Sequence, residues 1–180
     1  MEREVLKVRD LPASPAHEAQ AVRALGFVFP SGLMAADSRG RLAEAARVPE
    51  AFPYYGSPIK RQTCVILENL KRLCETAGTS LDGVVKAQVF LTDMNDFVYF
   101  DEVWRDYFRT APCRTTVATP GLLVEGARVL VDVVAIADAS QPVRVVTREG
   151  SRPLGHFSEA LRVGPLVFAA GQLASANSKM

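Results

Sequence analysis

The sequence predicts an α+β domain in which a mostly antiparallel sheet carries two helices on one face. Two stretches, residues 58–77 and 97–108, repeat their apolar residues at helical spacing, and two others, residues 84–91 and 127–137, read as strands. Helical spacing gathers the apolar side chains on one face, whereas a strand sends successive side chains to opposite faces. Because each helix must bury its apolar face, a sheet beside the helices supplies the partner layer.

The N-terminal part of the chain predicts short strands. Residues 3–9 have the pattern of a leading strand, and residues 20–24 and 27–31 that of two more. Leu25 and Gly26 form a two-residue connection between the last two, which is the length of a tight hairpin. We therefore expect these two strands to pair antiparallel.

Both predicted helices carry start signals. Ser57 can cap the first helix, Pro58 suits its first position, and Gly78 suits its end. The second helix follows the alternating strand at residues 84–91, and we expect its N-cap among Asp93, Asn95 and Asp96. An aromatic stripe runs down this second helix, a pattern that is far more often core than cofactor site.

The stretch that says most about function is residues 112–137. Arg114 begins an extended run there, and a long apolar strand with a single acid, Asp132, follows after a turn. If both strands lie in one sheet, we expect Arg114 and Asp132 on the face that the helices leave bare, covered by a neighbouring subunit. A guanidinium forks onto a carboxylate, so Arg114 is a candidate site for a small organic acid. The alternative is that Arg114 only pairs with Asp132 or another acid of the chain.

Composition excludes several classes of function. The net charge of +1 gives no electrostatic case for nucleic acid, and no apolar run reaches the length of a membrane span. The first ten residues are charged and lack the apolar core of a secretory signal. The 3 cysteines show no C-x-x-C spacing and indicate reduced thiols in the cytoplasm. The 2 histidines have no neighbouring ligand pattern, which argues against a metal site.

An internal repeat follows the predicted domain. Residues 153–174 resemble residues 14–35 at a constant offset of 139 positions without a gap, with identical pairs at His17/His156, Ala21/Ala160, Arg23/Arg162, Val28/Val167, Phe29/Phe168, Gly32/Gly171 and Ala35/Ala174. We therefore predict one complete domain at residues 1–139, with a linker and the first hairpin of an incomplete second copy at residues 140–180. Because a lone hairpin is marginal in water, we expect either a longer two-copy protein or a tail that pairs with another chain.

The sequence also resembles a known family. PCRTTV at residues 112–117, VLVDVVAIA at residues 129–137, and VVKAQVFLTDMNDF followed by VYFDEVWRDYF at residues 84–108 resemble the RidA/YjgF family, also called the L-PSP or reactive-intermediate deaminase family. The resemblance covers most of residues 14–137. It implies a chorismate-mutase-like fold with a mixed, mostly antiparallel sheet, and trimers with pockets between subunits. It also implies hydrolysis of 2-imino acids to 2-keto acids and ammonia, without a cofactor.

The resemblance assigns roles to five residues. Arg114 matches the family arginine that binds the substrate carboxylate, and Asn95 and Ser31 match positions that line the pocket. Thr116 stands where some members have a cysteine, and the backbone near it would help to orient the imine and a water. Glu18 stands where the family usually has an aromatic residue, and from there it could reach Arg114. The repeat keeps the aromatic residue, at position 157.

One departure from the family leaves three readings open. Leu130 stands where the family usually has a glutamate that handles the attacking water or the departing amine, and leucine can do neither. In an imine deaminase, either positioning and polarisation suffice because imines hydrolyse readily in water, or Glu18 or Asp132 replaces that glutamate. Otherwise the chain is a carboxylate-binding or structural module without turnover. Endoribonuclease activity, a label that some relatives carry, ranks last because no histidine pair or basic surface supports it.

Overall fold

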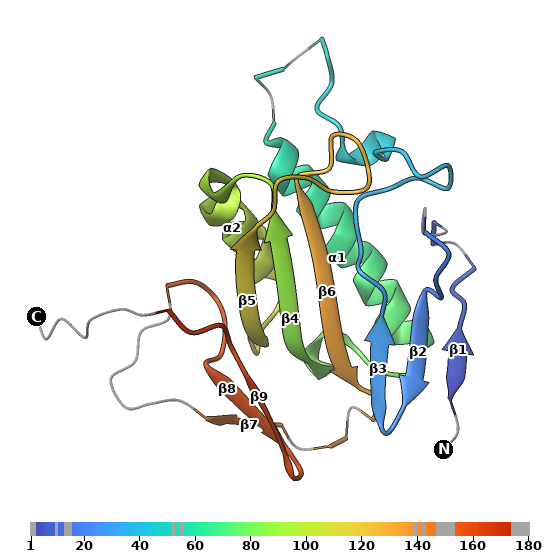
Figure 1. Cartoon of the computed structure of the whole chain (residues 1–180), viewed down its shortest axis with the longest axis vertical. Helices are drawn as coiled ribbons and strands as arrows, with labels where there is room; N and C mark the ends of the chain where they lie inside the picture. Colours follow the sequence, from blue (N-terminus) through green and yellow to red (C-terminus); the bar gives the residue numbers. More distant parts are fainter. Residues whose placement is uncertain are drawn as a thin grey trace, which may run out of the picture.

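The computed structural model describes residues 3–9, 11–12, 16–51, 53–54, 56–138, 140–141, 143–146 and 154–173. Within them lies a six-stranded sheet of order β1-β2-β3-β6-β4-β5 and a three-stranded sheet of order β7-β8-β9 (Figure 1). The elements of the first domain are β1 (Glu4–Leu6), β2 (Ala21–Ala24), β3 (Phe27–Pro30), η1 (Glu44–Ala46), α1 (Pro58–Thr76), η2 (Leu81–Gly83), β4 (Val84–Leu91), η3 (Met94–Asp96), α2 (Phe97–Tyr107), β5 (Cys113–Ala118) and β6 (Val129–Ile136). The small sheet consists of β7 (Val143–Val146), β8 (Ala160–Val163) and β9 (Leu166–Ala169).

The predicted α+β class is confirmed. Strand pairs in both sheets are antiparallel except β4 with β5, which is parallel, so the large sheet is mixed. The predicted strand at residues 84–91 has the bounds of β4. Ser57 caps α1 by accepting a hydrogen bond from the Lys60 backbone, and Asp93 caps η3, which leads into α2.

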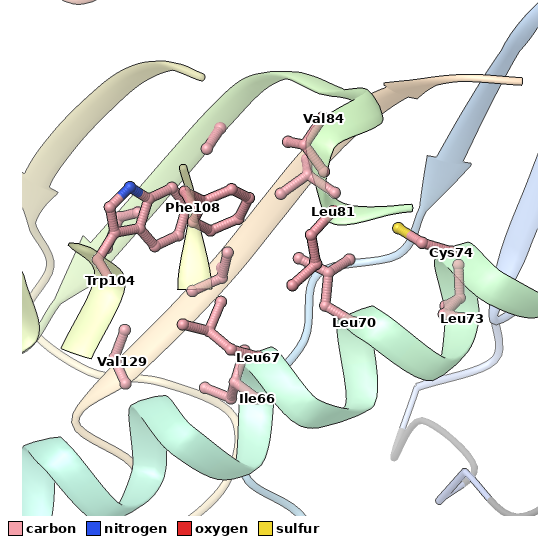
Figure 2. Packing of buried hydrophobic residues seen from close by; sticks show 14 of the residues in the cluster. Ile66, Leu67, Leu70, Leu73, Cys74, Leu81, Val84, Trp104, Phe108 and Val129 are labelled. Atoms are coloured by element: carbon pink, nitrogen blue, oxygen red, sulfur yellow. The ribbon is translucent and has the colours of Figure 1, made fainter. Parts of the chain in front are cut away.

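The two helices cover one face of the large sheet, as predicted. Figure 2 shows the α1 side chains Ile66, Leu67 and Leu70 pointing toward the strands, beside Trp104 of α2 and Phe108 just after it. These five residues are fully buried, and they share one core with the inward-facing residues of β4 and β6. Neither helix of the described chain has the length and apolar character needed to cross a bilayer.

The expected placement of Arg114 and Asp132 on one bare face was wrong. Ala87 of β4 lies beside Arg114 in the parallel register and beside Val133 in the antiparallel register, whereas Gln88 lies beside Asp132. Arg114 therefore shares the helix-covered face with Ala87, and Asp132 points to the opposite face. The reason is that β4 lies between β5 and β6, so the registers of two separate pairings decide which residues share a face.

The repeated segment forms the same hairpin as its first copy. β8 and β9 lie 139 positions after β2 and β3, and the pairing of Ala160 with Ala169 reproduces that of Ala21 with Pro30. The two ends of the repeat, at 153 and 174, lie outside the described residues. The hairpin does not stand alone, because β7 adds a third strand to it.

The small sheet packs against the large one, where β4 and β5 begin and β6 ends (Figure 1). A second apolar core joins them, and it includes Val85, Cys113 and Ile136 of the large sheet and Leu161 and Val163 of the small one. The Phe27 and Phe168 rings meet edge to face at 5.7 Å between centroids. The repeat thus covers part of the face that the helices leave bare.

Candidate functional site

The Arg114 side chain, near the start of β5, is buried among aromatic rings. Its side chain is buried, with 2% of the residue exposed, and its Nη2 donates to Oδ1 of Asp101 on α2 at 2.6 Å. Its Cζ lies between 5.3 and 5.6 Å from the centroids of four rings, those of Phe97, Phe100, Trp104 and Phe157. Burial lowers the pKa of Arg114 and the ion pair with Asp101 opposes this, so the guanidinium stays charged.

Helix α2 supplies three of the four aromatic rings around Arg114 and its ion-pair partner. Phe97 lies three and four residues before Phe100 and Asp101, and Trp104 lies four and three residues after them, which places all four on one face of the helix. Asp101 is a residue of this site that the sequence pattern did not predict. A signal was present, because an acid that interrupts an aromatic stripe must find a partner in the core.

The repeated segment packs against the Arg114–Asp101 ion pair. The backbone N–H of His156 donates to both carboxylate oxygens of Asp101, at 3.0 and 3.1 Å. Ser158 donates its N–H to the carbonyl of Pro112 and its hydroxyl to the carbonyl of Ala111. A Cβ on Gly155 would lie 2.8 Å from Nη2 of Arg114, so the backbone approaches the ion pair as closely as only a glycine permits.

A cavity of about 380 Å³ opens at this point between β5 and the repeated segment. Its polar lining consists of Arg114, Thr115, Thr116 and Gln172, and the rest is apolar side chains and Gly171. Nη1 of Arg114 and Oγ1 of Thr116 are both buried and have no hydrogen-bond partner among the described residues. Buried polar groups are almost always paired in folded proteins, so these two unsatisfied atoms are unusual, and both belong to residues that line the cavity.

The other residues that the sequence analysis named for a site lie elsewhere. Ser31 and Glu18 line a second, smaller cavity together with Gly32 and Leu33, and Ser31 donates its hydroxyl to the Ala19 carbonyl at 2.5 Å. β3 is separated from β5 by β6 and β4, which is about 14 Å at ordinary strand spacing. The structure therefore brings Arg114 and Thr116 together, and it does not bring Ser31 or Glu18 to them.

Asn95 lies close to the Arg114 cavity without lining it. Its side chain is exposed in η3, and its backbone N–H donates to Asp93 at 2.9 Å. The neighbouring Met94 is the residue of this turn that lines the cavity.

Leu130 and Asp132 do not line the Arg114 cavity either. Both lie on the face of β6 that points away from the helices, and a Cβ on Gly32 would lie 3.1 Å from the Leu130 side chain. Asp132 is half-buried, and burial raises the pKa of its carboxyl. Leu130 therefore contacts Gly32, and it does not contact the Arg114 cavity.

The offset of the repeat explains why the site is assembled from two copies. Phe157, Gly171 and Gln172 line the Arg114 cavity, and they are the counterparts of Glu18, Gly32 and Leu33 in the first copy. Glu18, Gly32 and Leu33 line the smaller cavity described above, which is separate from the Arg114 cavity. The second copy of the hairpin therefore brings to Arg114 the positions that the first copy holds elsewhere.

Two further ionisable side chains, those of Lys86 and Cys113, lie at the junction of the two sheets. Lys86 donates its Nζ to the hydroxyl of Thr115 at 3.0 Å and to the carbonyl of Ala169 at 2.6 Å, and burial lowers its pKa. Burial raises the pKa of the Cys113 thiol, whose Sγ donates to the carbonyl of Phe168 at 3.1 Å. Both groups serve the junction of the two sheets. No group of three or more His, Cys, Asp or Glu side chains suited to a metal ion occurs in the described part of the chain.

Comparisons with known proteins agree with this fold. Residues 9–138 match the family model described as endoribonuclease L-PSP. A RutC family protein of Pyrococcus horikoshii is 34% identical over 136 residues, which is 75% of this chain and 97% of that protein. The crystal structure of RidA from an Antarctic Psychrobacter is 30% identical with a TM-score of 0.61, and the match covers 74% of this chain and 98% of that one. A Rid family protein of unknown function from Yersinia pestis is 27% identical with a TM-score of 0.63, covering 75% and 99%.

The family match spans the large sheet from β2 to β6 together with both helices, and it ends before the repeated segment. It includes α2, β5 and β6, and hence both Arg114 and Asp101. The chain therefore belongs to the endoribonuclease L-PSP family, the family of the RidA/YjgF and RutC proteins.

Proposed function

We propose that this protein binds small 2-imino and 2-keto acids in the Arg114 cavity and hydrolyses the imines to 2-keto acids and ammonia without a cofactor. The observation that carries the proposal is a pair of buried polar atoms, Nη1 of Arg114 and Oγ1 of Thr116, that have no hydrogen-bond partner in the part of the chain that the structure describes. A carboxylate can accept a hydrogen bond from each of them. Leaving a buried polar group unsatisfied costs about 1–3 kcal/mol, so a carboxylate that pairs with both stabilises the site.

The chemistry needs only a positioned water. Water adds to the carbon of the C=N bond, the nitrogen takes up the protons, and the C–N bond breaks to release ammonia and leave the C=O group. The hydroxyl of Thr116 and the amide of Gln172 are the neutral polar groups that line the cavity with Thr115, and they can orient the water and the imine nitrogen. Bound geometry by itself lowers the barrier of such an addition.

A second candidate function is carboxylate binding without turnover. Arg114 is the one ionisable side chain among the described residues that line the cavity, so no carboxylate or imidazole there can act as general acid or base. A general acid or base typically contributes about a hundred- to ten-thousand-fold in rate. Ribonuclease activity is not proposed, because a net charge of +1 offers RNA no attraction.

The proposal is tested by following 2-imino acids that an amino-acid oxidase generates in situ, with semicarbazide as the trap. We expect the protein to accelerate imine loss, and Thr116→Val to reduce this acceleration and the affinity for the 2-keto product roughly tenfold, the effect of one hydrogen bond to a carboxylate. Thr119→Val is the matched control, because Thr119 lies just after β5 and does not line the cavity. Product binding without acceleration selects the binding module, and absence of both contradicts the proposal.

A further inference from the structure

We infer that the Arg114 cavity selects monocarboxylates with an apolar side chain, and that the repeated segment, residues 154–173, builds the wall that selects them. The inference rests on the carboxylate binding proposed above and names the class of acid that the site prefers. It follows from which side chains line the cavity and which charges are already paired around it.

The cavity offers one anchor for charge and an apolar wall for the rest of the ligand. Apart from its polar end, the described lining consists of apolar side chains and Gly171. The first domain contributes Met94, Phe97 and Val117, and the repeated segment contributes Leu154, Phe157 and Leu173. A ligand held by its carboxylate at Arg114 would place its side chain among these groups, where burial of each methylene contributes about 0.8 kcal/mol.

A second carboxylate on the ligand would find no cation besides Arg114 among the described residues that line the cavity. Arg105 lies nearby, but it pairs with Asp101 at 3.4 Å and its side chain is 65% exposed. Lys86 donates to Thr115 and Ala169 and does not line the cavity. A second carboxylate would therefore gain no ion pair, and it would take the place of apolar groups that the wall could bury, so dicarboxylates are disfavoured.

The wall is held by the contacts that seat the repeated segment. Gly171 donates its backbone N–H to the carbonyl of Arg114 at 3.3 Å, which fixes the chain next to Leu173. His156 donates to Asp101, and Ser158 donates to the Ala111 carbonyl just before β5. These hydrogen bonds fix the chain on both sides of Phe157. Leu154 and Leu173 stand at the rim and are 80% and 76% exposed, so they can be replaced without disturbing a core.

The experiment measures the affinities of two 2-keto acids by titration calorimetry. 4-Methyl-2-oxopentanoate carries an apolar side chain, and 2-oxoglutarate carries a second carboxylate. We expect the 180-residue chain to bind the first at least about tenfold more tightly, which is a difference of about 1.4 kcal/mol. Trp104 is the single tryptophan of the sequence, and its ring centroid lies 5.3 Å from Cζ of Arg114, so a change in its emission places the ligand at this site.

A charge at the rim tests whether the repeated segment makes the selection. Leu154→Arg should improve the affinity for 2-oxoglutarate by up to about fivefold, the range of an exposed ion pair, and weaken that for the apolar acid. Leu166→Arg places the same charge on β9 of the same hairpin, outside the cavity lining, and should leave both affinities unchanged.

The outcomes separate this inference from the proposed function. Equal affinities for the two acids, or equal effects of Leu154→Arg and Leu166→Arg, would overturn the inference while carboxylate binding at Arg114 still holds. If neither acid binds or changes the Trp104 emission, the proposed function itself fails, and the inference with it.

Discussion

The two terminal nitrogens of Arg114 have different surroundings. Nη2 is paired with Asp101, whereas Nη1 is buried without a partner among the described residues. Breaking a buried ion pair by removing one partner typically costs about 3–5 kcal/mol, so replacing Arg114 would disturb the fold as well as the site. Thr116 is the better residue to probe, because it lines the same cavity and its hydroxyl takes no part in the ion pair.

Leu25 adopts a left-handed backbone conformation, which is unfavourable for a leucine. Its φ is 55° and that of Gly26 is 78°, the pair of positive angles of a type I′ hairpin turn. A left-handed conformation costs an ordinary residue about 1–2 kcal/mol, and asparagine tolerates it better. We expect Leu25→Asn to raise the free energy of unfolding by about 1 kcal/mol in urea titrations. Leu123→Asn is the control, since Leu123 is equally exposed and has no positive φ; an equal gain there would contradict the turn argument.

Asp132 predicts a pH dependence of stability. Burial raises the pKa of its carboxyl in the folded state, with a hydrogen bond from the Val133 backbone opposing it. The folded protein thus holds this proton more tightly than the unfolded chain, and ionisation costs stability as the pH rises through the folded pKa. We expect Asp132→Asn to unfold at higher urea than the wild type near neutral pH, with the difference shrinking toward about pH 4. A difference that does not change with pH would contradict this assignment.

The hairpin β8–β9 shows how one element can serve in two places. Its first copy, β2–β3, pairs with β6 through β3 and extends the large sheet, whereas the second copy packs against that sheet from outside and forms its own with β7. The two copies have different neighbours: β3 pairs with β6, whereas β9 packs against β4 and β5. The edges of the large sheet are β1 and β5, and the repeated segment packs next to β5 and wraps over it to α2.

Gly171 tests how closely this packing must fit. A Cβ at this position would lie 2.8 Å from Cγ2 of Thr115, so we expect Gly171→Ala to loosen the repeated segment from β5. The expected result is a loss of about 1–3 kcal/mol in the free energy of unfolding, typical of overpacking, together with weaker binding of 2-keto acids. Gly121→Ala is the matched control, because a Cβ there meets nothing within 4 Å. Unfolding curves that coincide for the two variants would show that the contact adapts freely.

For the molecule as a whole, the consequence is a pocket completed within one chain. The resemblance to the RidA/YjgF family implies pockets between subunits of a trimer, yet here the Arg114 cavity takes its lining from the first domain and from the repeat of the same chain. The face near the β5 edge, where a neighbouring subunit was expected, is partly covered by the small sheet.

A dilution series tests whether one chain suffices. We expect the affinity of each chain for 4-methyl-2-oxopentanoate to stay constant as the protein is diluted through the concentration at which any oligomer dissociates. The physical reason is that mass action weakens a site only when its parts come from separate chains. Titrations followed by Trp104 emission, alongside sedimentation at the same concentrations, make the comparison. An affinity that falls together with the oligomer would show that a second chain contributes to the pocket.

Local pattern was enough to predict the elements and much of the fold. The strand at residues 84–91, the Ser57 cap and the hairpin turn at Leu25 depend on neighbours within a few positions, and all three are found as predicted. The tertiary structure alone decided that Arg114 points toward the helices, that Asp101 pairs with it, and that the repeat supplies Phe157 to its cavity. These three facts depend on which strands become neighbours and in which register, and register is set by burial between segments far apart in the sequence, which no local periodicity encodes.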